Sequence, residues 1–88
     1  MSMRIRIVAS GRFYHWTEHL PDELEVPGGA SLDTVLERLT ELLPPEGQLP
    51  ATCLVAVAGR HVGTVGAHEN RSLADGDELV LISPVAGG

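Results

Sequence analysis

Lysine is absent from this sequence of 88 residues, and all six basic residues are arginine. Twelve Asp and Glu residues outnumber them, which gives a formal net charge of −6. A chain with this balance and no basic run repels phosphate backbones, so we expect no nucleic-acid partner. The acidic surface instead favours association with basic surfaces of other proteins.

Cysteine is almost absent as well. Cys53 has no second cysteine with which to form an internal disulfide, and one thiol is too few for a thiolate-based zinc or iron–sulfur site. No run reaches the ~18 apolar residues that a membrane helix requires, and residues 1–4 lead into a strand pattern rather than a signal peptide. We therefore expect a cytoplasmic protein that does not associate with membranes.

The first half of the chain has patterns typical of two strands and a helix. In residues 3–9 the apolar Met3, Ile5, Ile7 and Ala9 alternate with Arg4, Arg6 and Val8, which predicts a strand with one buried face. Residues 23–26 predict a second, short strand. Ser31 is a plausible N-cap for a helix that ends at Pro44-Pro45. The apolar residues that recur at helical spacing are Leu32, Val35, Leu36, Leu39, Leu42 and Leu43.

The second half predicts three more strands. Residues 52–58 are rich in β-branched side chains, Gly59-Arg60 turns the chain, and residues 61–65 return as a short strand. A tight turn at residues 75–77 leads into a last strand at residues 78–83. We expect an α+β fold of order β-β-α-β-β-β, with a mixed sheet of four to five strands packed against one main helix.

The end of the sequence has almost no side chains. After Ser83 it reads Pro84-Val85-Ala86-Gly87-Gly88. Because Pro84 removes a backbone donor and the last residues cannot pack, we expect a domain at residues 1–83 and a flexible tail at residues 84–88. An unbranched terminal carboxylate can pass through a narrow channel into the active site of another protein, where it could attack the α-phosphate of ATP.

With this element order and this end, the chain resembles the MoaD/ThiS family of ubiquitin-like sulfur carriers, which have the β-grasp fold. Residues 73–88 are similar in particular to the small subunit of molybdopterin synthase (MoaD), which commonly carries an L-x-D-G-D-E run, an apolar strand and a P-P-V-x-G-G ending. Ser83 replaces the first of the two prolines. Residues 55–59 resemble the V-A-V-N-G segment of the family, with Ala58 where Asn is common. Residues 11–17 depart from the family, which often has an Arg- and Leu-rich helical segment there.

The resemblance implies a carrier that has no active site and binds no cofactor. Gly88 would be adenylated by a ubiquitin-activating-type enzyme, which uses the ATP, and converted to a thiocarboxylate. The tail, residues 84–88, would then enter the large subunit of molybdopterin synthase or another sulfur-accepting synthase. Ile82 and His61 match positions at the partner-facing surface of the family. Arg60 is either part of that surface or a solvated turn residue.

Other candidate residues have simpler explanations. Cys53 begins an apolar strand and is favoured as a small core residue over a nucleophile, because no base or second thiol is near it in sequence. Asp75 and Asp77 flank a glycine and are explained by turn chemistry. We expect His61 and His68 to be exposed loop residues.

Residues 10–21 leave two alternatives open. His15 and His19 are four residues apart, a spacing that places two imidazoles on one face of a helix, but the segment has no helical period and no third ligand follows. A surface pair is therefore favoured over a metal site. The same segment holds every aromatic residue, which either cover one end of the core or contact a partner; they are Phe13, Tyr14 and Trp16.

The terminal glycines are compatible with three functions. The first is a sulfur carrier for molybdopterin, or alternatively for thiamine, cysteine or secondary-metabolite synthesis. The second is a ubiquitin-like modifier that forms isopeptide bonds with other proteins. The third is a binding module with no chemistry at its end, because fold alone does not decide function.

Overall fold

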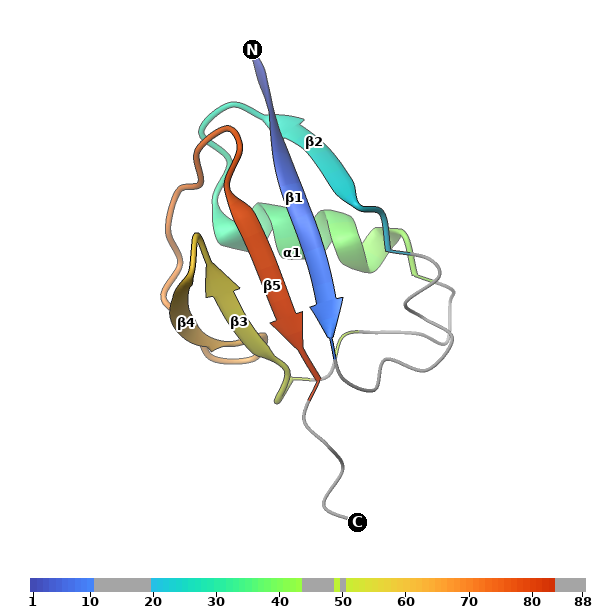
Figure 1. Cartoon of the computed structure of the whole chain (residues 1–88), viewed down its shortest axis with the longest axis vertical. Helices are drawn as coiled ribbons and strands as arrows, with labels where there is room; N and C mark the ends of the chain where they lie inside the picture. The colour runs from blue at the N-terminus through green and yellow to red at the C-terminus, as the bar shows by residue number, and fades with distance from the viewer. Residues whose placement is uncertain (11–19, 44–48, 50, 84–88) are drawn as a thin grey trace.

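The computed structural model describes residues 1–10, 20–43, 49 and 51–83 of the chain (Figure 1). Within them the element order is the expected β-β-α-β-β-β. The elements are β1 (Ser2–Ser10), β2 (Glu23–Pro27), α1 (Leu32–Glu41), β3 (Leu54–Val57), β4 (Arg60–Thr64) and β5 (Glu78–Ile82).

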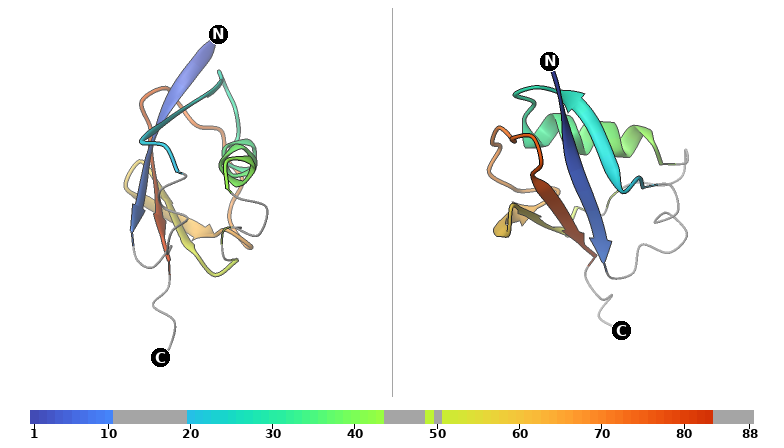
Figure 2. Two further views of the ribbon diagram at one scale, coloured as in Figure 1. Left: turned by 90° about the vertical axis from the view of Figure 1, so that its right-hand side faces the viewer. Right: turned by 45° about the horizontal axis from the view of Figure 1, so that its top comes forward.

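The strands form one five-stranded sheet in the order β2-β1-β5-β3-β4. β1 and β5 are parallel, and the other neighbouring strands are antiparallel. Figure 2 shows α1 on one side of this sheet. The expected mixed sheet with one helix is therefore confirmed, and the opposite side of the sheet, which we call the outer face, is left without a covering helix in the described residues.

The core lies between α1 and the sheet. Alternate residues of β1, β3 and β5 point toward the helix, as the period-two patterns predict. Burial of these side chains is the main favourable contribution to the stability of the fold, because no disulfide is present. The core consists of Met3, Ile5, Ile7, Val26, Ala30, Leu32, Val35, Leu36, Leu39, Leu43, Leu49, Cys53, Val55, Val57, Leu73, Leu79 and Leu81.

Helix α1 begins at the predicted N-cap. Ser31 has extended backbone angles, and its Oγ accepts a hydrogen bond from the Thr34 N–H at 3.3 Å. At the other end the prediction was wrong for Leu42, which is 44% exposed. Leu42 is the C-cap, so it follows the last helical turn and points away from the core, whereas Leu43 is buried. No helix in the described part of the chain could span a membrane.

The segment before β5 provides hydrogen-bond acceptors for the N-terminus of α1. The first N–H groups of a helix have no partner within it. Here the Leu32 N–H donates to Arg71 O at 2.7 Å, and the Asp33 N–H donates to Asn70 Oδ1 at 3.1 Å. The start of the helix is thus bound to residues almost 40 positions later in the chain, which no local pattern in the sequence indicates.

His68 lies in the same region, and its prediction as an exposed loop residue was wrong. Its side chain is only 10% exposed, and its Nε2 lies 2.6 Å from Asp33 Oδ1. The error arises because the carboxylate partner is 35 residues earlier in the sequence, on α1. His61, the other histidine, is exposed as expected, although it lies in β4 rather than in a loop.

The turn between β3 and β4 is displaced by one residue from the predicted position. Its central residues are Ala58 and Gly59, with φ of +50° and +81°, and Arg60 is already the first residue of β4. Two consecutive positive φ angles are typical of the type I′ turn, which fits the twist of a two-stranded hairpin. Ala58 is the one non-glycine residue with positive φ among those described.

We expect Ala58→Asn to stabilise the protein by about 0.5–1 kcal/mol, because Asn tolerates the left-handed conformation that Ala disfavours. The free energy of unfolding in urea measures the effect. Ala74→Asn is the matched control, since Ala74 is also exposed and has a negative φ. Equal stabilities of the two variants would contradict the explanation.

Candidate functional site

The last strand leaves the sheet from a fixed position. β5 lies between β1 and β3, and Ile82 is paired with Ser10 on one side and Leu54 on the other. The Ser83 N–H then donates to Ser10 O at 2.9 Å, and Ser83 is buried. The chain therefore continues into residue 84 from an anchored end of the sheet. The expected tail lies outside the described residues; its members are Pro84, Val85, Ala86, Gly87 and Gly88.

Apolar side chains gather on the outer face beside this point. Leu54 and Ile82 are 38% and 39% exposed and form a cross-strand pair. Two residues earlier on β5, Val80 lies on the same face and pairs with Val8 of β1 on one side and Ala56 of β3 on the other. These three residues are half-buried. We call these five residues the exit patch.

The exit patch is unusual for a sheet that has a helix on only one side, because the other side of such a sheet is normally polar. Contiguous exposed apolar surface of this kind marks protein interaction sites. Sequence reasoning identified Ile82 but missed the other four residues. The available signal was that β3 and β5 are apolar on both faces, with Leu54 and Ala56 alternating with buried valines.

The structure places the other predicted interface residues differently from one another. His61 is paired with Ala56, so it lies on the outer face at the margin of the exit patch. Arg60 is paired with Val57, whose side chain points into the core, and it lies at the turn end of the hairpin. Val57 is three positions along β3 from Leu54, so Arg60 lies about 10 Å from the Leu54–Ile82 pair along the strand. The structure therefore brings His61 and Ile82 to one patch but not Arg60.

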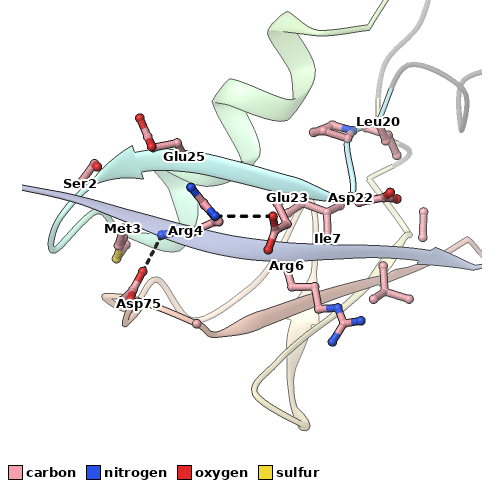
Figure 3. A pocket seen from close by; sticks show the side chains of 14 residues that line it. Ser2, Met3, Arg4, Arg6, Ile7, Leu20, Asp22, Glu23, Glu25 and Asp75 are labelled. Carbon is pink, nitrogen blue, oxygen red and sulfur yellow. Dashed lines mark hydrogen bonds and ion pairs between the residues drawn. The ribbon is translucent and has the colours of Figure 1, made fainter.

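The remainder of the outer face, over β1 and β2, is charged (Figure 3). Arg4, Arg6, Glu23 and Glu25 line an open hollow there of about 1110 Å³. Arg4 Nη1 lies 4.0 Å from Glu23 Oε1, and both side chains are more than half exposed, so this ion pair adds little stability. The outer face thus changes from charged to apolar along β1 toward the end of β5.

The two carboxylates of the 75–77 turn have structural roles. Asp75 Oδ1 accepts a hydrogen bond from the Arg4 N–H at 2.8 Å, and Asp77 Oδ2 accepts one from the Ala74 N–H at 2.8 Å. The Asp77 contact lies within the turn and confirms the prediction of turn chemistry for that residue. Turn chemistry does not explain Asp75, whose contact joins the turn before β5 to β1, 71 residues earlier in the sequence.

Cys53 is a core residue, as predicted. Its side chain is fully buried, and burial raises the pKa of its thiol to about 11, against a smaller opposing effect of a backbone hydrogen bond at Ile82. The thiolate is the nucleophilic form of cysteine, so this thiol is unreactive near neutral pH. Although it lies close to the end of β5, it is not available to an acyl group there.

Metal ligands do not cluster in the described part of the chain, where no three His, Cys, Asp or Glu side chains come together. His15 and His19 fall outside that part, so the hypotheses for this pair stay predictions. The same holds for the aromatic residues of the segment, which are Phe13, Tyr14 and Trp16.

Comparison with known proteins adds one finding. Residues 11–88 match the model of the ThiS family, which leaves only the first ten residues outside the match. The matched region contains β2, α1, β3, β4 and β5, with the exit patch residues of β3 and β5, and the glycine end. No curated protein matches the chain.

Proposed function

Because the chain belongs to the ThiS family of ubiquitin-like sulfur carriers with the β-grasp fold, we propose that Gly88 is the group that carries the sulfur. Members of this family are small and generally non-catalytic, and they work with adenylating enzymes and sulfur-accepting synthases. We further propose that this carrier serves the synthesis of molybdopterin, as the non-catalytic small subunit of the synthase.

The proposed chemistry uses only the terminal carboxylate of this chain. A carboxylate oxygen of Gly88 attacks the α-phosphorus of ATP in the activating enzyme, and pyrophosphate leaves. Hydrosulfide, as the sulfur donor, then attacks the carbonyl carbon and forms the C–S bond, the bond between that carbon and the phosphate oxygen of AMP breaks, and the terminus becomes a thiocarboxylate with no change of oxidation state. Gly87 and Ala86 present almost no side chain to a narrow channel, and Pro84 and Val85 connect this end to β5.

The observation that carries the proposal is the position of the exit patch beside the end of β5. A partner that binds Leu54 and Ile82 also receives the chain at residue 84, since Ser83 is hydrogen-bonded to Ser10 next to that pair. His61 contributes at the margin of this interface. Arg60 belongs with the solvated turn rather than the interface.

Molybdopterin is proposed as the destination on the similarity of residues 73–88 and 55–59 to the molybdopterin synthase subunit. A direct test loads the chain with sulfur and offers it to the large synthase subunit with its pterin precursor, and separately to a thiazole synthase with its substrates. Sulfur transfer to the pterin supports the proposal. Transfer only in the thiazole reaction assigns the carrier to thiamine synthesis instead.

We expect the double substitution Leu54→Ser with Ile82→Ser to weaken binding to the adenylating enzyme by at least about tenfold, because central apolar residues contribute most of the energy of an interface. The dissociation constant from calorimetry measures the effect. Leu42→Ser is the matched control, since Leu42 is equally exposed but lies at the end of α1. The docking surface is misassigned if both variants bind as the unmodified chain does.

A further inference from the structure

His68 makes hydrogen bonds only to acceptors. Its Nε2 lies 2.6 Å from Asp33 Oδ1, and its Nδ1 lies 2.9 Å from Thr64 O and 3.1 Å from Val65 O. A carboxylate and two carbonyl groups can accept but not donate. Both ring nitrogens are therefore satisfied only when each carries a proton, which is the charged imidazolium form.

The charged groups around His68 favour the same form. Asp33, Glu37 and Glu41 of α1 line one groove of about 410 Å³ together with His68, and Glu69 follows it in the chain. Burial by itself would lower the pKa of His68, but the hydrogen bonds to Asp33 and to the Thr64 and Val65 carbonyls, with the charge of Asp33, raise it overall. Arg71 is the nearest basic residue in sequence, and its backbone carbonyl accepts a hydrogen bond from the Leu32 N–H at the helix N-terminus.

The residues on either side of His68 cover an edge of the sheet. β4 is the last strand on its side, and an uncovered last strand presents unpaired N–H and C=O groups. Residues 67–69, which we call the strap, pair with it instead. The Thr64 N–H donates to Ala67 O at 2.9 Å, the Glu69 N–H donates to Val62 O at 3.1 Å, and Gly63 and His68 form a β-bridge.

Among the side chains of the strap, only that of His68 makes hydrogen bonds in the described part of the chain, and its contact with Asp33 is the one that reaches α1. Thr64 Oγ1 also accepts a hydrogen bond from the Ala67 N–H at 3.1 Å. We propose that charged His68 is a latch that holds the strap against β4, and that loss of its proton releases the strap and exposes the edge of the sheet. The latch is thus a pH-sensitive device that joins α1 to the edge strand.

The direction of the pH dependence follows from the geometry. His68 binds its proton more tightly in the folded chain than in the unfolded chain, where its pKa is about 6.5. The stabilising effect of the latch is therefore complete below that pH and is lost as the pH rises through the higher pKa of the folded state. The strap is closed in mild acid and opens in base.

Amide hydrogen exchange tests the latch directly, because the Thr64 and Glu69 amides are protected by the strap. Protection factors correct for the intrinsic pH dependence of exchange. At pH 6 we expect His68→Gln to lower both factors by about tenfold or more, and in the unmodified chain we expect a similar fall between pH 6 and pH 9. His61→Gln is the matched control, since His61 lies on β4, the strand that the strap covers, and its side chain makes no hydrogen bond to a described residue.

A second variant separates charge from hydrogen bonding. Asp33→Asn retains an oxygen acceptor but removes the negative charge, so the pKa of His68, followed by NMR titration, should fall below that of the unmodified chain. The latch is overturned if His68 titrates at or below pH 6.5 in the unmodified chain, or if strap protection does not change with pH. It is also overturned if His68→Gln and His61→Gln exchange alike.

Discussion

We expect removal of Gly87 and Gly88 to abolish sulfur loading and to leave the domain folded. The carboxylate that we propose to react would then be displaced by two residues and would no longer reach the α-phosphate of ATP in the partner. The domain stays folded because its buried core lies between Met3 and Leu81. Incubation with ATP, the activating enzyme and a sulfur donor is followed by intact mass, in which loading adds about 16 Da as sulfur replaces oxygen.

Two further chains sharpen this result. Ala86→Gly keeps the tail unbranched, so it should load within about twofold of the unmodified chain. One residue added after Gly88 should prevent loading as completely as the deletion does. A gain in mass by the truncated chain would place the reactive group elsewhere and remove the basis of the proposed function. The latch at His68 is independent of this outcome, since its test measures exchange in the isolated chain.

We expect Gly63→Ala to destabilise the domain by about 2–4 kcal/mol. Gly63 has a φ of +132°, which residues with a Cβ rarely adopt. A Cβ at this position would also overlap Ala67 O and would lie 2.7 Å from His68 Cα. Both atoms belong to the backbone of the strap, so the contact is relieved only if the strap moves away from β4. Urea unfolding measures the loss.

Gly59→Ala is the matched control for this prediction. Gly59 also has a positive φ, of +81°, but nothing lies within 4 Å of a Cβ built there. Its replacement should therefore cost only the backbone strain, about 1 kcal/mol. The difference between the two losses in free energy of unfolding measures the steric clash between a Cβ at position 63 and the backbone of the strap. If both variants lose the same stability, the strap does not pack against Gly63 as described.

The elements themselves could be predicted because their signals are local. The alternation of Met3, Ile5 and Ile7 marks the buried face of β1, and Ser31 marks the start of α1. The observed ends of some strands differ from the predicted ends by one or two residues where a turn sets them. One such turn contains Ala58, and its positive φ could not be predicted because alanine disfavours that conformation. Leu42 was misplaced because the periodicity of a helix stops at its C-cap.

The candidate site could be predicted only in part. Ile82 was identified from the sequence, and its neighbours were not, because Leu54 is 28 positions away and becomes a neighbour only through antiparallel pairing of β3 with β5. The register between β3 and β4 places His61 near Ile82 and Arg60 farther from it. The two residues are adjacent in sequence, so the sequence alone does not distinguish them. Membership of the surface depends on register, which is a property of the assembled sheet.

The amino-acid sequence by itself determined the order of the elements, the buried face of each strand, the absence of lysine and the glycine end. These depend on periodicity, turn chemistry and composition, which are local or global properties of the chain. The tertiary structure alone decided that the end of β5 lies beside an apolar patch and that His68 meets Asp33. Such contacts join residues far apart in sequence, and they form only when long-range strand pairing and helix packing bring those residues together.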